Sequence, residues 1–190
     1  MAARFRRLRR GGIQANLETA EAAVLIQLSR EQAGVLAGAG EDPEPGARGI
    51  PEPGAGGVRQ EPDPVVARLF PRAYLDPTEE EAESEWQRFA RPDLVEGRKE
   101  AMETLLRTLA GARQHRGGLE VTLTSEEADA WLAVINDFRL ALGTRLEVTE
   151  DTTPADLDPD DPATPPFAVY WWLGYLEEHL VDVLASGGDA

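Results

Sequence analysis

Apolar side chains recur every three or four positions over much of this chain, which is the spacing that places them on one face of an α-helix. The clearest case follows Ser125, where Trp131, Ile135 and Phe138 fall on a single stripe. This spacing, combined with helix-start signals, predicts helices over residues 19–36, 64–70, 76–91, 93–110, 125–142 and 166–185.

Shorter stretches alternate between apolar and polar residues, as a strand with one buried face does. Alternation over residues 13–17 follows a Gly11-Gly12 pair, which suits a tight hairpin with a preceding strand around Phe5. Residues 119–123 alternate in the same way, and Leu146 and Val148 repeat the pattern briefly. We therefore expect an N-terminal β-hairpin and further short strands.

Prolines and capping residues predict where the helices begin and end. Asp63-Pro64 and Asp76-Pro77 each place a capping side chain before a proline in the first helical turn. Pro92 is expected to break the second of these helices, so that another begins at Asp93.

The 125–142 helix carries signals at both of its ends. Thr124 and Glu127 fit a capping box, in which each side chain satisfies a free backbone donor of the other residue. Gly143 is expected to close the helix in the left-handed conformation.

These elements predict a mainly α fold. It is a compact helical bundle with a small N-terminal β-hairpin and one or two further short strands flanking the 125–142 helix. Residues 1–190 are expected to form a single regulatory domain. Two segments fall outside this core, a flexible Pro/Gly-rich insertion at 40–62 and an acidic loop at 149–164.

Composition excludes several classes of function. The chain has 35 acidic and 19 basic residues, a net charge of −16, so most of its surface repels nucleic acid. It has no Cys and two His, which excludes thiol chemistry and thiolate metal sites. With no catalytic motif present, we predict a non-enzymatic protein without metal or cofactor. No stretch has the ~20 apolar residues that cross a bilayer, so a cytoplasmic protein without membrane contact is expected.

The first twelve residues carry five arginines and no acidic residue. This basic arm has two interpretations, of which contact with the protein's own acidic surface, or plain solubility, is favoured. The alternative is contact with phosphate groups or an acidic partner. The residues concerned are Arg4, Arg6, Arg7, Arg9 and Arg10.

A polar cluster lies beside the apolar stripe of the 125–142 helix. It consists of Asn136, Asp137, Arg139 and Arg145. The favoured interpretation is structural, since buried or half-buried charges need partners within the fold. The alternative is a contact surface for another protein, to which the Asn and Arg side chains supply directional hydrogen bonds.

The run AWLAVINDFRLALGTRL at residues 130–146 resembles a motif of an actinobacterial family. This is the AosR-like family of oxidative-stress transcriptional regulators, which was long catalogued as a domain of unknown function. Two other parts agree with it, the run from Asp63-Pro64 to Tyr74 and the closing YWWLGYL at residues 170–176. The resemblance covers nearly the whole chain outside the insertion and the acidic loop.

The resemblance implies a regulator that acts with a stress-response sigma factor and RNA polymerase to raise transcription of cysteine-biosynthesis genes, with any DNA contact indirect. It also implies redox sensing through an internal disulfide. This chain has no Cys, so that switch cannot operate here.

Two other functions stay open beside partner contact. One is direct DNA binding through the basic arm, which the charge of the remaining chain opposes. The other is a small-molecule site on the aromatic side of the last helix, where Tyr170, Trp171 and Tyr175 lie away from the core stripe.

Overall fold

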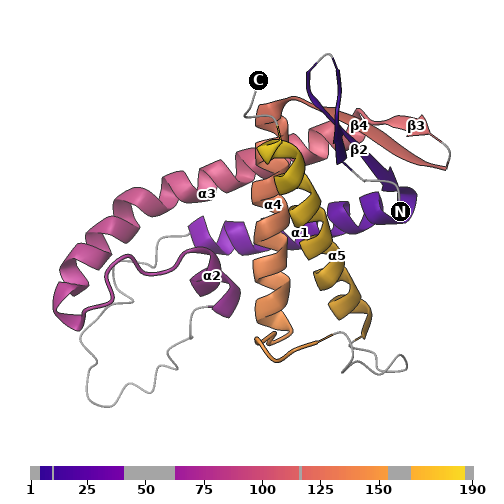
Figure 1. The fold of residues 1–190 in the computed structure, drawn as a ribbon. Coiled ribbons are helices and arrows are strands. Elements are labelled where there is room, and N and C mark those ends of the chain that lie inside the picture. The colour runs from indigo at the N-terminus through magenta and orange to yellow at the C-terminus, as the bar shows by residue number, and fades with distance from the viewer. Residues whose placement is uncertain (1–4, 10, 41–62, 116, 154–163, 187–190) are drawn as a thin grey trace.

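The computed structural model describes residues 5–9, 11–40, 63–115, 117–153 and 164–186 (Figure 1). The strands are β1 (Phe5–Arg7), β2 (Ile13–Glu18), β3 (Arg113–His115) and β4 (Gly118–Leu123). The helices are α1 (Thr19–Gly40), α2 (Pro64–Leu69), α3 (Glu80–Ala110), α4 (Ser125–Arg145) and α5 (Thr164–Ala185), with a short 3₁₀ helix, η1 (Pro77–Glu79), before α3.

The four strands form one antiparallel sheet in the order β1-β2-β4-β3. The predicted hairpin is confirmed, with Gly11 and Gly12 at φ +86° and +84°, which L side chains rarely adopt. The predicted strand at 119–123 is confirmed as part of β4. Its partner β3 was not predicted, because three exposed residues carry no hydrophobic alternation.

Helix α4 lies at the centre of the helical layer, where it contacts each of the other four α-helices (Figure 1). Its start is as predicted, with both hydrogen bonds of the Thr124–Glu127 capping box in place. The mainly α fold with a small β element is therefore confirmed.

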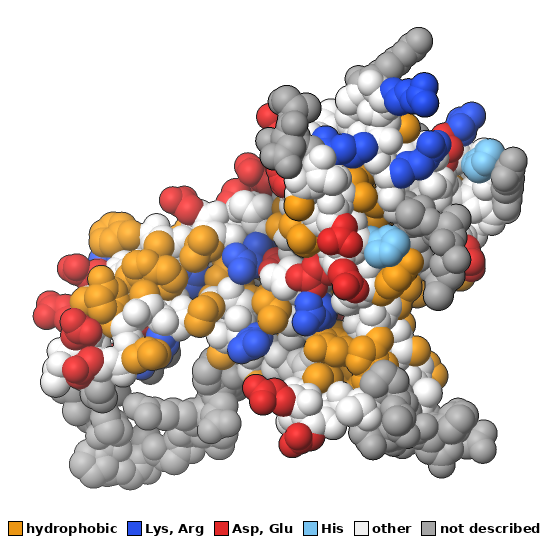
Figure 2. Space-filling view, viewed as in Figure 1, with side chains coloured by type: hydrophobic (Ala, Val, Ile, Leu, Met, Phe, Trp, Pro, Cys, Tyr) orange, Lys and Arg blue, Asp and Glu red, His pale blue; other side chains and the backbone are white. Residues whose placement is uncertain are grey.

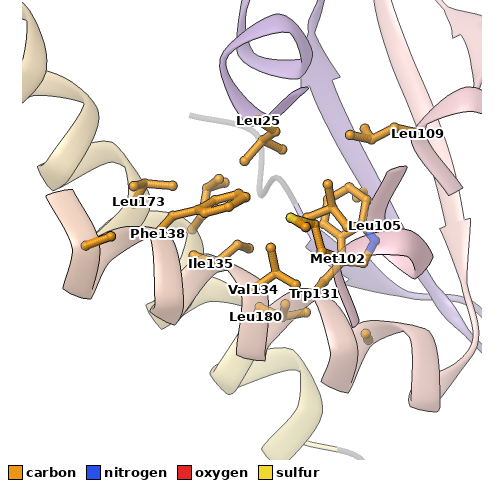
Figure 3. Packing of buried hydrophobic residues seen from close by; sticks show 14 of the residues in the cluster. Leu25, Met102, Leu105, Leu109, Trp131, Val134, Ile135, Phe138, Leu173 and Leu180 are labelled. Atoms are coloured by element: carbon orange, nitrogen blue, oxygen red, sulfur yellow. The ribbon is translucent and has the colours of Figure 1, made fainter. Parts of the chain in front are cut away.

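The core is built around Trp131 of α4, which is fully buried (Figure 3). Its indole nitrogen donates a 2.9 Å hydrogen bond to the hydroxyl of Thr108 on α3. The ring of Phe5 on β1 meets it edge-on, with 6.3 Å between ring centroids. Trp131 thus ties the first strand, α3 and α4 together.

The expectation that Pro92 breaks a helix is wrong, because α3 runs through it without interruption. Pro92 and Arg88, whose carbonyl loses its usual donor, are both exposed, so water can satisfy that carbonyl. Arg91 and Arg98, on either side of Pro92, both lie over the ring of Phe70, at 5.4 and 4.8 Å. These contacts hold the helix on both sides of the proline.

The expected left-handed cap at Gly143 is also wrong. Gly143 lies inside α4, and the residue with positive φ after the helix is Glu147, at 52°. A Cβ at Gly143 would lie 3.0 Å from the ring of Tyr170, so this glycine permits close approach of α5. Leu146 lies in a turn after α4, and Val148 follows that turn without forming a strand.

Most of the two predicted irregular segments lies outside the described residues. This applies to residues 41–62 of the insertion and 154–163 of the acidic loop. Asp63 caps α2 as predicted, since its carboxylate accepts a 2.8 Å hydrogen bond from the Val65 backbone. Among the described helices, none combines the length and apolar character that a membrane span requires.

Candidate functional site

Asp137 of the α4 cluster pairs with Arg98 of α3. The side chain of Asp137 is nearly buried, and its carboxylate lies 3.1 Å from the Arg98 guanidinium. Arg98 also donates to the Leu69 carbonyl at 3.0 Å and stacks on Phe70. This arginine therefore connects α3, α4 and the end of α2 in one place.

Burial and the ion pair act on the Asp137 carboxyl in opposite directions. Burial raises its pKa, and the neighbouring positive charge of Arg98 offsets this only in part, so the pKa stays above its usual value. Folding thus makes Asp137 harder to ionise. Its ion pair with Arg98 connects α4 to α3, but burying the carboxylate removes it from water, which costs free energy.

Arg139, two residues further along α4, contacts a different helix. It forms an ion pair with Glu177 of α5, and its guanidinium lies 5.8 Å from the centre of the Tyr170 ring. The hydrogen bond from Arg139 to Glu177 is the largest cause of a raised Arg139 pKa, to which Tyr170 adds. Tyr170 of α5 thus contacts a residue of α4.

Arg145 and Asn136 complete the predicted set. Arg145 pairs with Glu31 of α1 at 3.2 Å, with both side chains substantially exposed. Asn136 lines a cavity of about 370 Å³ together with Arg68 and Tyr170. The four residues therefore do not all converge, although Asn136 and Arg139 line the same cavity. Three pair with three different helices, and the role of the cluster in partner binding stays a prediction.

The described part of the basic arm lies against the protein itself. Arg7 donates to the carbonyls of Val183 and Leu184 at 2.9 and 3.0 Å, placing its positive charge at the C-terminal end of α5. Arg6 donates to Gln14 at 2.6 Å, and Arg9 is exposed. Arg4 and Arg10 lie outside the described residues, and phosphate contact by this arm stays a prediction.

The outer face of the sheet carries a polar network that the sequence did not indicate. Glu120 of β4 pairs with Arg113 of β3 and accepts a 2.6 Å hydrogen bond from Gln14 of β2. The hydrogen bond from Arg113 is the main reason that the pKa of Glu120 is lowered. Strand register brings these residues together, and local sequence patterns do not give that register.

The predicted residues do not form a catalytic constellation where they are described. No group of three or more His, Asp or Glu in this part of the chain is arranged to hold a metal ion. Arg98, Glu177 and Arg68 were missed by sequence reasoning because each lies far along the chain from its partner on α4.

Comparison with protein families gives the decisive match. The model of a domain of unknown function, DUF2017, matches residues 2–184. The chain belongs to this family. The resemblance carried by the 130–146 motif is thereby confirmed.

Two curated mycobacterial proteins are similar in sequence to this chain. Oxidative stress regulator AosR of Mycobacterium tuberculosis (strain ATCC 25618 / H37Rv) is 35% identical over 133 residues, a match covering 64% of this chain and 58% of the relative. Putative oxidative stress regulator AosR of Mycobacterium leprae (strain TN) is 36% identical over 135 residues, covering 65% and 59%. The chain thus matches somewhat less than two thirds of the length of these relatives. No solved structure matches it.

Proposed function

We propose that this protein is a non-enzymatic transcriptional regulator. It acts by contact with a stress-response sigma factor and tunes cysteine-biosynthesis and oxidative-stress genes. The observation that carries the proposal is the 35% identity to oxidative stress regulator AosR over 133 residues.

The charge of the chain supports a protein partner over direct DNA contact. A net charge of −16 accelerates association with a basic partner and opposes approach to a phosphate backbone. Arg6 and Arg7 already donate to groups within the protein, so they would have to leave those contacts to reach phosphates.

The signal in this homologue is not a disulfide within the chain, because the chain has no Cys. Regulation through a partner or a bound ligand fits that composition. A specific feature favours a ligand as the second candidate function, namely the cavity of about 370 Å³ lined by Asn136, Arg139 and Tyr170.

A gel-shift on the promoter of a cysteine-biosynthesis gene tests the proposal. The protein is expected to change the mobility of the promoter only when the sigma factor and RNA polymerase are present. A shift by the protein alone, with a salt slope of about −4 to −5 in log affinity that disappears when the basic arm's arginines become Ala, would instead establish direct DNA binding. If neither occurs and a metabolite raises the melting temperature, the ligand-binding function is supported.

A further inference from the structure

Exposed apolar side chains are concentrated in one part of the structure. We call residues 72–94, which comprise the segment before α3 and its N-terminal half, the α3 protrusion. Among the described residues, five large apolar side chains are exposed, and four belong to it: Tyr74, Leu75, Phe89 and Leu94. Phe89 is 70% exposed and Leu75 is 83% exposed. The fifth, Val181, lies on α5 and serves below as a control.

The protrusion stands away from the rest of the molecule. In Figure 1 the N-terminal half of α3 extends beyond α4 and the other helices that pack on α4. Figure 2 shows hydrophobic side chains gathered over this half of the helix, with acidic side chains along its rim. An apolar surface with a polar rim is the usual anatomy of a protein-binding site.

Hydrogen bonds hold the protrusion in a defined shape. The buried Glu83 carboxylate accepts hydrogen bonds from the backbone nitrogens of Ala73 and Tyr74, both at 2.9 Å, and from Gln87 at 2.6 Å. Arg72 pairs with Glu80 at 2.6 Å. The segment before α3 is therefore fastened along the helix, which makes the exposed apolar residues part of an ordered surface.

The rim of the protrusion is strongly acidic. Between residues 76 and 90 there are six acidic residues and one basic residue. Glu79, Glu81 and Glu85 are exposed, and none forms an ion pair with another residue in the described ranges. Their charges are thus available to a partner.

Charge decides which kind of partner fits this surface. A second copy of the chain would bring the same acidic rim and a further net charge of −16 toward it. Nucleic acid and anionic lipid surfaces are repelled for the same reason. A basic, amphipathic protein helix matches both features, since its apolar side chains can cover Phe89 and Leu75 while Lys or Arg faces the acidic rim.

We infer that the α3 protrusion is a docking surface for a basic amphipathic helix of a partner protein. Phe89 and Leu75 supply the apolar contact, and Glu79, Glu81 and Glu85 supply the charge. The inference rests on the proposed function only for the identity of the partner, which would then be the sigma factor.

The test uses the full chain and a fluorescently labelled helical peptide with Leu on one face and Lys on the other. Its affinity is measured by fluorescence anisotropy. The Leu75→Ser/Phe89→Ser variant is expected to weaken binding at least about tenfold, whereas Val181→Ser leaves binding unchanged. Circular dichroism checks that each variant keeps its helical content.

A second set of variants tests the charge. Glu79→Gln/Glu81→Gln/Glu85→Gln is expected to weaken binding about tenfold at low salt and to reduce its salt dependence. The matched control removes three exposed charges away from the protrusion, in Glu103→Gln/Asp129→Asn/Glu178→Gln, and is expected to retain binding within about twofold.

Several results would overturn the inference. They are failure of the peptide to bind the wild-type protein, equal losses of affinity in the protrusion and control variants, or a wild-type dimer that Phe89→Ser converts to a monomer.

The same variants are then tested for binding to the sigma factor. If the wild-type protein binds the peptide through the protrusion but does not bind the sigma factor, the proposed function fails and the docking surface stands. If all variants bind the sigma factor equally, the protrusion is not its docking surface and the proposed function stands.

Discussion

The two halves of α3 form one helix in two different environments. After Val95 the helix buries Met102, Leu105 and Leu109 in the core, against α1 and α4. Before it, Phe89 and Leu94 are exposed on the protrusion. The comparison shows that a regular helix can continue well beyond the core that stabilises it, and that apolar residues there are available for contact with other molecules.

The largest expected difference comes from truncating one apolar side chain in each half. Leu105→Ala removes a fully buried side chain and should lower the free energy of unfolding by about 2–5 kcal/mol. Phe89→Ala removes a side chain that is 70% exposed and should change it by less than about 0.5 kcal/mol. Urea unfolding measures both values. Similar losses in the two variants would mean that Phe89 is packed in solution.

Arg98, just beyond the boundary between the halves, gives the next largest effect. In Arg98→Met the nearly buried Asp137 loses its ion-pair partner, and we expect a loss of about 3 kcal/mol near neutral pH. The hydrogen bond to the Leu69 carbonyl is lost as well. Urea unfolding at several pH values separates these two contributions.

The pH dependence of that variant has a definite sign. Burial already raises the pKa of Asp137 against the opposing effect of Arg98, and removing Arg98 raises it further. An acid with a higher pKa in the folded state loses stability as pH rises from its unfolded pKa through its folded pKa. The loss should therefore be larger at about pH 7 than at about pH 4. Arg98→Met/Asp137→Asn should lack this difference, and if it persists there Asp137 is not its source.

Pro92 lies between the two halves and weakens the helix there. Pro92→Ala restores a donor for the Arg88 carbonyl, and should stabilise the helix by about 1–3 kcal/mol, since the proline is inside α3 and exposed. Hydrogen exchange of the amides in residues 80–91 measures the local effect. A gain confined to those amides would show that the protrusion opens independently of the core, and no gain at all would contradict the prediction.

The smallest expected changes in stability come from replacing Gly97 and Gly143 by Ala, and the two variants can be compared directly. A Cβ at Gly97 of α3 meets no atom within 4 Å, so Gly97→Ala should stabilise by about 0.5–1 kcal/mol through helix propensity. Gly143→Ala should lose that gain or destabilise the protein, because its Cβ would lie 3.0 Å from the Tyr170 ring. Thermal melting distinguishes the two. Equal gains would mean that Tyr170 can move aside without cost.

Local patterns in the sequence were enough to predict the hairpin, the strand at β4 and the capped starts of α2 and α4. Each depends on residues within a few positions of one another, such as Thr124 and Glu127 or Asp63 and Val65. The same local rules failed at Pro92 and Gly143. There the outcome depends on distant contacts, with the Phe70 ring in one case and the Tyr170 ring in the other.

The candidate site was predictable as a list of residues but not as an arrangement. Polar residues beside an apolar stripe identified Asp137, Arg139 and Arg145, yet their partners Arg98, Glu177 and Glu31 lie on three other helices. Pairing across helices depends on how those helices pack, which hydrophobic periodicity along one helix does not specify.

The contact between Arg7 and Val183 joins positions separated by 176 residues. During translation, the ribosome must release nearly all of the described chain before this contact can form. Until then the Arg7 guanidinium of β1 lacks its acceptors on α5, so this contact can form only after α5 has been synthesised. Nascent chains stalled before α5 should therefore leave the N-terminal strand accessible to chaperones and proteases.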